Sequence, residues 1–451
     1  MSARRRAGDL AWTASTADMV ATSCGTAVAA VCALGLFQIE RLLAGVWSVA
    51  AVLTAGCVCA MLARTFARLA AVIPSGASLL AYLSRGFGRR AGVAIAVPYL
   101  LLTLFLVGAE ATVVGLVVAR LAPVPAPAAS LVFLVGTWLL CRAGIQVGYR
   151  VQALATWALL VGLGALSLQP IAAAAWRGDL AARLLPPAPP AVDFVAGVGL
   201  AIFLFMGFEL ITTQVEVSST AVVGKALRVS VAVLTAFYAL VSIGFSCMAV
   251  APRELTSGFV PQLALAEQAG GAGALALVAL LTVLASFTSF NGALLSLSRF
   301  AYALAAQGTL PRRLARVEPR SLVPRGAMSA LLAIAVGATA LVAFGDLLMP
   351  SLLAAAVAAS LLYGGALLAR QRPPFAEEDR RAGARHVGIA LALVLAGLGA
   401  GVVIDAGPAR VTLLVLLAAA YGVAALGCLR VPQSARAVPL SLARPAPTHG
   451  D

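Results

Sequence analysis

Long apolar runs, separated by short polar segments, make up most of the chain. Each run has close to the ~20 residues that a helix needs to cross the hydrocarbon core of a bilayer. Several runs are longer, and we expect those helices to be tilted. The pattern predicts an all-α polytopic membrane protein with twelve transmembrane helices. The predicted spans are residues 18–37, 42–63, 91–119, 128–147, 151–175, 191–216, 226–250, 272–305, 326–345, 347–369, 387–405 and 410–429.

The spans and their flanking segments divide the chain into four regions. Residues 1–17 form a predicted cytoplasmic N-terminus, and residues 18–370 hold the first ten helices, which we take as the core. Residues 371–430 hold the last two helices. Residues 431–451 are rich in Pro, Ala and Arg, and this composition predicts a disordered cytoplasmic tail.

The basic residues support this arrangement. With a cytoplasmic N-terminus, all but six of the 32 Arg and Lys residues fall in cytoplasmic segments or at their membrane edges, as the positive-inside rule predicts. We therefore expect a multi-pass protein of the plasma or inner membrane with both termini in the cytoplasm. The cytoplasmic connections 64–90 and 307–325 are longer than the others, but neither is large enough for a catalytic domain. The six exceptions are Arg41, Arg120, Arg177, Arg183, Arg253 and Arg410.

Composition narrows the class further. A chain that is 62% hydrophobic and only 11% charged is not a soluble domain. The net charge of +15 follows the membrane topology, and no basic run is interleaved with aromatic residues as in nucleic-acid-binding proteins. The seven cysteines all lie in apolar segments and lack metal-ligand spacing. We expect membrane lipid around the protein, and no nucleic acid, metal or cofactor.

Two predicted spans contain a glycine near the middle of the membrane. The first span has Cys24-Gly25-Thr26-Ala27, and the sixth has Gly207-Phe208-Glu209. Two interrupted helices, five spans apart, are typical of folds with two inverted five-helix repeats. An unwound turn exposes half-helix N-termini that suit a carboxylate, and carbonyl groups that suit a cation. The alternative is that both glycines serve close packing of helices.

Glu209 is an ionisable residue in the middle of the sixth span. A carboxylate is expensive to bury in a bilayer, and such residues usually belong to a substrate or ion pathway. The alternative is a structural carboxylate that binds the unwound backbone. Phe205 and Phe208 flank the same break. They could cap a site with an aromatic face, or simply pack in the core.

Two more polar features lie within predicted spans. Glu110, in the third span, could face a central cavity, or it could lie hydrated or paired near the extracellular edge. Ser286, Thr288, Ser289 and Asn291 form a polar patch in the eighth span. Their oxygens could ligate sodium together with freed carbonyl groups, or they could form hydrogen bonds between helices.

Three motifs occur in a characteristic order along residues 18–370. The strongest runs from Ser298 to Pro311, where an Arg–Tyr helix end leads into Gly308-Thr-Leu310-Pro311 and continues to Pro324. The second begins at Pro74-Ser-Gly76 and ends at Phe87-Gly88. The third is Gly207-Phe208-Glu209 with Glu216 seven residues later. Together these motifs resemble the amino acid–polyamine–organocation (APC) superfamily of transporters.

The chain also departs from the pattern of that superfamily. The Gly-Ser-Gly of the first span is here Gly25-Thr26-Ala27, and Arg68 stands where an acidic residue usually precedes the loop proline. After Glu216, the usual Lys and Pro are replaced by residues 218–221, Ser-Ser-Thr-Ala. These departures indicate a divergent branch in which the pocket or the coupling is altered.

The resemblance implies a LeuT-type fold with broken helices 1 and 6. It also implies secondary transport of an amino acid or a related organic amine, driven by a proton or sodium gradient or by exchange. The implied substrate contacts are Cys24, Gly25, Thr26, Ala27, Phe205, Gly207, Phe208, Glu209, Ser289 and Asn291. The candidates for ion coupling are Glu209, Glu110, Ser286 and Ser289.

Two other classes of function remain as alternatives. One is a membrane sensor or scaffold with a transporter fold. The other is a polytopic membrane enzyme, for which the chain lacks a cluster of His, Asp or Cys at a membrane face. No phosphate-binding GxxxxGK[ST] loop is present, so we do not expect ATP hydrolysis.

Overall fold

The computed structural model describes residues 13–215, 217–248, 260–306, 310–318, 321, 323–345, 347–372 and 382–430. These residues form helices and no strand. Eleven helices are long and apolar enough to cross a membrane, and the bent pair α1 (Thr16–Ala27) and α2 (Cys32–Leu42) makes a twelfth span. The predicted all-α fold with twelve spans is confirmed.

The remaining helices comprise the other spans and a few short helices between them. The first half continues with α3 (Val46–Val72), α4 (Ser78–Phe87), α5 (Arg89–Leu121), α6 (Ala126–Ala143), α7 (Ile145–Arg177) and α8 (Leu180–Leu184). The second half has α9 (Ala191–Phe203), η1 (Phe208–Gln214), α10 (Thr220–Ser246), α11 (Pro261–Ala306), η3 (Arg312–Ala315), α12 (Arg325–Gly345), α13 (Leu348–Arg370), α14 (Ala382–Asp405), η5 (Gly407–Ala409) and α15 (Arg410–Arg430).

Local signals define several helix ends. Ser15 begins α1 with a capping box, in which its hydroxyl accepts from the N–H of Asp18 and the Asp18 carboxylate accepts from the N–H of Ser15. Ser219 caps α10 through the N–H of Val222. Gly178 ends α7 in the left-handed conformation that favours glycine. These caps satisfy backbone groups that would otherwise lack partners at helix ends.

Two helices extend beyond the predicted spans. The second span continues as α3 to Val72, and the following connection contains the amphipathic helix α4, whose Leu79, Tyr82 and Leu83 are buried. Helix α11 begins before the eighth span, at Pro261, but it is kinked at Gly271 (φ 64°), and the part that can cross a membrane, Gly270–Ala306, agrees with the predicted span. Apolar content alone did not predict the added turns at the end of α3.

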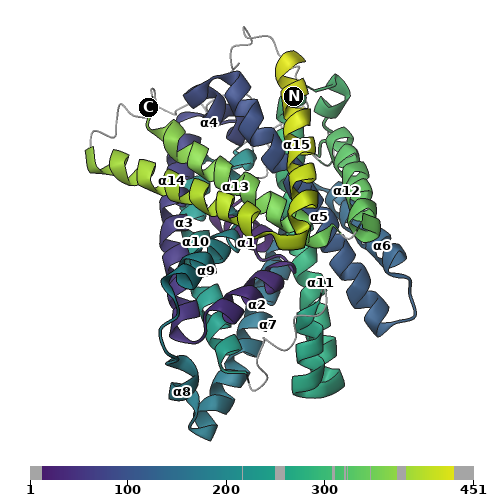
Figure 1. Ribbon diagram of the computed structural model, residues 1–451. Coiled ribbons are helices and arrows are strands. Elements are labelled where there is room, and N and C mark those ends of the chain that lie inside the picture. Colours follow the sequence, from purple (N-terminus) through teal and green to yellow (C-terminus); the bar gives the residue numbers. More distant parts are fainter. Residues whose placement is uncertain are drawn as a thin grey trace, which may run out of the picture.

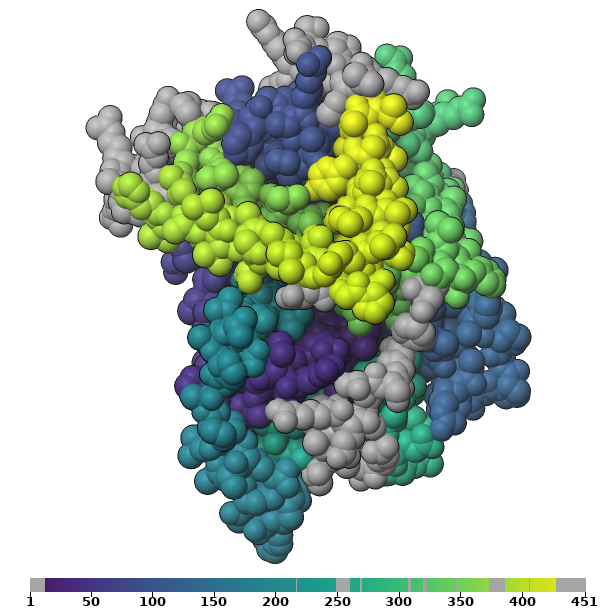
Figure 2. All heavy atoms as spheres, viewed as in Figure 1, coloured from purple at the N-terminus to yellow at the C-terminus, as the bar shows by residue number. Residues whose placement is uncertain are grey.

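The two broken spans lie at the centre of the bundle. α1 packs against α7, α10, α11 and η1, and η1 also contacts α3 and α4. Figure 1 shows α1 and α2 at mid-height among longer helices. The last two spans, α14 and α15, lie outside α13 and α5, and in Figure 2 they cover one face while α2 (purple) is visible beside them.

Some expectations are not tested by this architecture. The inverted-repeat relation, the division into four regions and the cytoplasmic position of the termini stay predictions. Residues 431–451, for which a disordered tail is predicted, and residues 1–12 lie outside the described residues, as do Arg253 and Glu216.

Candidate functional site

The break in span one lies just beyond the glycine motif. α1 is helical through Gly25, Thr26 and Ala27, and the chain then bends by 63° before α2 begins at Cys32. The prediction that Gly25 opens the backbone is therefore wrong. A Cβ at position 25 would lie 2.2 Å from Oγ1 of Thr156, so this glycine instead allows close packing of α1 against α7.

The break in span six lies where the sequence predicts it. α9 ends at Phe203, and Gly207 has φ 102° before the 3₁₀ helix η1 begins at Phe208. Only glycine adopts this backbone conformation without strain. A Cβ on Gly207 would also lie 3.1 Å from Cγ2 of Thr26. The break in span six therefore lies against the last turn of α1.

Side chains from neighbouring helices satisfy the carbonyl groups at both breaks. The Tyr238 hydroxyl of α10 lies 3.2 Å from the carbonyl oxygen of Ala27 and 3.0 Å from that of Leu204. The Ser23 hydroxyl of α1 donates to the carbonyl oxygen of Phe208 at 3.0 Å. These polar contacts hold the two interrupted helices in register with each other.

Glu110 of α5 satisfies the N–H groups at the start of α2. Its carboxylate accepts hydrogen bonds from the N–H groups of Ala30 and Val31, both at 3.0 Å, and from the Ser286 hydroxyl at 2.7 Å. A negative charge is favourable at a helix N-terminus. The glutamate is fully buried, so its carboxylate is not hydrated but paired with these donors.

Glu209 lies behind the break in span six. Its carboxylate accepts hydrogen bonds from the Tyr363 hydroxyl at 2.8 Å, from the Gly207 N–H at 3.2 Å and from the Tyr99 hydroxyl. The ring of Phe208 packs beside Tyr363. Glu209 is fully buried, and these three donors are neutral. A carboxylate held in this way is stabilised without an ion pair.

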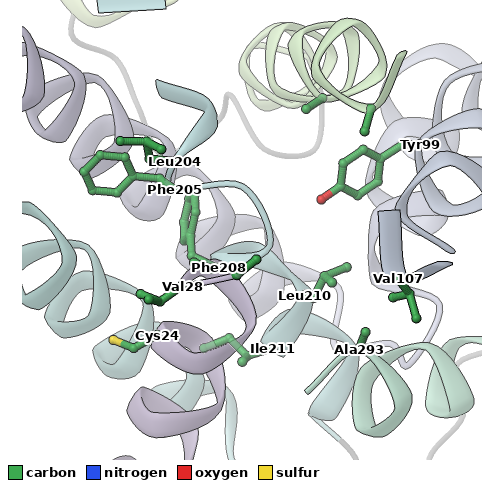
Figure 3. Close-up of a cluster of buried hydrophobic side chains, with 14 of the residues drawn as sticks. Cys24, Val28, Tyr99, Val107, Leu204, Phe205, Phe208, Leu210, Ile211 and Ala293 are labelled. Atoms are coloured by element: carbon green, nitrogen blue, oxygen red, sulfur yellow. The ribbon is translucent and has the colours of Figure 1, made fainter. Parts of the chain in front are cut away.

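A cavity of about 90 Å³ lies where the two breaks meet. Four of the predicted contacts line it, namely Thr26, Ala27, Gly207 and Ser289. None of the described residues around it is charged. Figure 3 shows the Tyr99 side chain of α5, with Val107 and Ala293 below it in this view and Leu210 of η1 nearby. The remaining lining residues are Ala29, Val31, Cys32, Gly35, Thr103, Leu106, Leu200, Phe203, Leu204, Met206, Leu352, Leu353, Ala356 and Val402.

The other predicted contacts do not line this cavity. Cys24 and Phe205 are buried against α10, and Gly25, Phe208 and Glu209 lie behind the cavity wall. Asn291 belongs to a separate buried network. It donates to Gln152 at 2.7 Å and accepts from the Cys141 thiol at 2.8 Å.

The four residues of the polar patch in the eighth span therefore have different roles. Ser286 binds Glu110, Ser289 lines the cavity, and Asn291 joins α11 to α6 and α7. The Thr288 hydroxyl donates to the Ala285 carbonyl within α11 at 3.0 Å. Within the part of the chain that the structure describes, no group of three His, Cys, Asp or Glu side chains is placed to hold a metal ion.

Hydrogen bonds join η1 to its neighbours α4, α7 and α11. The hydroxyls of Ser78, on α4, and Thr212 lie 2.8 Å apart. Gln214 donates to the Ser296 hydroxyl at 2.7 Å and accepts from Tyr149. All residues of η1 are buried. The connection between the second and third spans thus packs directly on the broken sixth span.

Sequence reasoning missed the tyrosines that surround the breaks. Tyr99, Tyr238 and Tyr363 are each almost completely buried within apolar helices. A buried tyrosine hydroxyl needs a hydrogen-bond partner, so a tyrosine in the middle of a span was an available signal for a polar feature nearby. The pattern could not show that two of them share Glu209.

Comparison with known proteins adds the family. The sequence model of the amino acid permease family matches residues 14–424. No curated protein matches the chain. The family match covers the twelve spans, including both breaks and the cavity between them. The chain therefore belongs to the amino acid permease family, within the APC superfamily, and is a polytopic membrane transporter.

Proposed function

We propose that the chain is a secondary active transporter of small amino acids or related organic amines, and that its substrate binds in the cavity between the two breaks. The observation that carries the proposal is the meeting of both breaks at one cavity, lined by Ala27, Ala29 and Gly207. Interrupted helices are tolerated at membrane depth where they line a cavity, and they supply backbone groups for a ligand.

Glu209 is the proposed carrier of a coupled proton. Its hydrogen bonds come from two tyrosine hydroxyls and the N–H of Gly207, so a change in protonation would not break an ion pair with any of these donors. Its neighbour Leu210 and its donors Tyr99 and Gly207 line the cavity. Proton relays in transporters commonly use such buried carboxylates. Ser286 supports a proton over sodium, because its hydroxyl is committed to Glu110.

The orientation proposed here has α4 and both termini in the cytoplasm of a plasma or inner membrane. The basic residues of the connection that holds α4 support it. In a variant without its native cysteines, a cysteine introduced by Ser75→Cys should then react with an impermeant thiol reagent only from the cytoplasmic side. Labelling of this cysteine from outside intact cells would contradict the proposed orientation.

Uptake into proteoliposomes tests the proposed transport. Purified protein should accumulate a labelled amino acid or amine under an inward proton gradient, and should not depend on sodium. Neither a sensor nor a membrane enzyme predicts accumulation. Binding without any uptake would favour the sensor, and chemical conversion of the substrate would favour the enzyme.

A native cysteine allows a direct test of the proposed site. Cys32 lines the cavity, whereas Cys57 is exposed on α3. A methanethiosulfonate reagent should block uptake, and saturating substrate should slow the block. Cys32→Ser should abolish this sensitivity, while the matched variant Cys57→Ser should retain it. Equal sensitivity of both variants would place the substrate elsewhere.

A further inference from the structure

Three helix ends surround the central cavity, and they differ in charge. α1 ends at Ala27 and α9 ends at Phe203, so two C-termini with their partial negative charge reach the cavity wall. The third end is the N-terminus of α2, beside Val31. An N-terminus of this kind is the natural binding place for a carboxylate group of a ligand.

In this chain a side chain already occupies that N-terminus. Glu110 accepts from the N–H groups of both Ala30 and Val31, at 3.0 Å each. The Ser286 hydroxyl holds one oxygen of the same carboxylate at 2.7 Å. All three contacts are buried, and Ala29 and Val31 also line the cavity. The carboxylate therefore lies next to the cavity, with its hydrogen bonds made.

A second carboxylate would find poor surroundings in the cavity. None of the described residues that line it carries a charge. Glu110 and Glu209 are both hydrogen-bonded to residues that do line it, Glu110 to Val31 and Glu209 to Gly207 and Tyr99. To reach the N–H groups of Ala30 and Val31, a ligand would have to displace Glu110 and leave a buried carboxylate without these partners, which is strongly unfavourable. A cationic amine, in contrast, is attracted by the C-termini of α1 and α9.

We propose that Glu110 is a specificity-determining residue that fills the carboxylate-binding position of the site, so that the transported substrate is a small amine without a carboxylate group. This inference rests on the proposed function, because it assumes that substrate enters the central cavity. It narrows the two substrate classes, amino acid and amine, to the second. The apolar lining favours an amine with a small apolar body.

Matched pairs of ligands test the inference on the wild-type protein. Isobutylamine and valine differ only by the carboxylate, as do ethylamine and alanine, and 3-methylbutylamine and leucine. Thermal stabilisation and uptake are measured for both members of each pair. We expect the amine to bind on the order of 10-fold or more tightly than its amino acid in at least one pair. Equal or tighter binding of the amino acid, or binding of none of the three amines, would overturn the inference.

Variants of Glu110 test its role in this selection. Glu110→Ala leaves the N–H groups of Ala30 and Val31 without their acceptor. Valine should therefore gain affinity relative to isobutylamine by about 10-fold. Glu40→Gln is the control. Glu40 is also a buried glutamate, but it lies near the C-terminal end of α2, where it accepts a hydrogen bond from Ser246. It should leave the ratio unchanged. An unchanged ratio in Glu110→Ala would overturn the assignment.

A milder variant covers the case in which Glu110→Ala does not fold. Ser286→Ala removes one hydrogen bond from the Glu110 carboxylate and keeps its charge. It should shift the ratio in the same direction by a smaller factor, and no shift would count against the proposal. Uptake of an amino acid without its amine would contradict this inference and leave the transport function standing. Uptake of neither class would contradict the proposed function itself.

Discussion

The Ser23 hydroxyl and the Phe208 carbonyl oxygen lie 3.0 Å apart and join the two interrupted helices by a hydrogen bond. Ser23 lies in the last turns of α1, and Phe208 is the first residue of η1. Both residues are buried. A single side chain of span one thus holds the backbone of span six at the position where that backbone changes direction.

Ser23→Ala should weaken both folding and substrate binding. It leaves a buried carbonyl group without this donor, which costs about 1–3 kcal/mol. The matched control is Ser48→Ala, because Ser48 donates to the carbonyl of Gly45 in a buried turn far from the cavity. Both variants should lower the melting temperature, but only Ser23→Ala should raise the KM for uptake. Equal KM values in the two variants would show that the bond is purely structural.

The two motif glycines should fail for different reasons. Gly207→Ala forces a left-handed backbone on a residue with a Cβ, at a cost of about 1–2 kcal/mol, and it also crowds Thr26. Gly25→Ala meets no backbone strain but places a Cβ 2.2 Å from Oγ1 of Thr156. Thr156→Ala should therefore restore part of the uptake lost in Gly25→Ala, and none of that lost in Gly207→Ala.

The glycine variants need a helical control. An added Cβ on Gly337 of α12 would meet nothing within 4 Å, so Gly337→Ala should leave uptake and stability near wild type. Normal uptake by Gly207→Ala would show that the break in span six tolerates an ordinary residue and would remove the geometric basis of the site.

Glu209→Gln should separate accumulation from exchange. A glutamine cannot carry the proton, so gradient-driven accumulation should disappear while exchange of internal for external substrate persists, with little dependence on pH. Tyr363→Phe removes one donor, at 2.8 Å, from the carboxylate, and it should shift the pH profile of uptake without abolishing it. An unchanged affinity together with an unchanged pH profile in Glu209→Gln would leave this residue as a structural carboxylate.

Opening toward the α4 side should require η1 to separate from α4. The hydroxyls of Ser78 and Thr212 lie 2.8 Å apart, so the double variant Ser78→Cys, Thr212→Cys should form a disulfide under oxidation. Uptake should then stop and return after reduction, while each single variant should remain active under both conditions. Full uptake by the oxidised, cross-linked protein would mean that this contact persists throughout the transport cycle.

The sequence predicted those features that depend on local residue patterns. The apolar runs are long enough to count the spans, and the Gly207-Phe208-Glu209 motif placed one break correctly because glycine there adopts φ 102°. The other break was misplaced by a few residues. Residues 28–31, Val-Ala-Ala-Val, have no local reason to leave a helix. Their bend is stabilised by Glu110, which is about 80 residues distant in sequence.

The partners of the buried carboxylates were beyond prediction for the same reason. Glu209 stood out because a charge is costly in an apolar span. Its donors Tyr99 and Tyr363 come from α5 and α13, and nothing in either helix's own pattern indicates which residue its tyrosine meets. Apolar periodicity shows which segments are buried, but pairings between distant buried polar groups follow from tertiary packing.

The position of Glu110 also has an evolutionary consequence. Because a side chain of another helix stabilises the bend after Ala27, we expect residues 28–31 and residue 110 to evolve together. A substitution that neutralised position 110 would leave the N–H groups of Ala30 and Val31 without their acceptor, and it would favour either new acceptors or a straighter first span. Divergence of this transporter from its relatives should therefore proceed by paired changes at these two distant places, and searches for glycine motifs alone would overlook it.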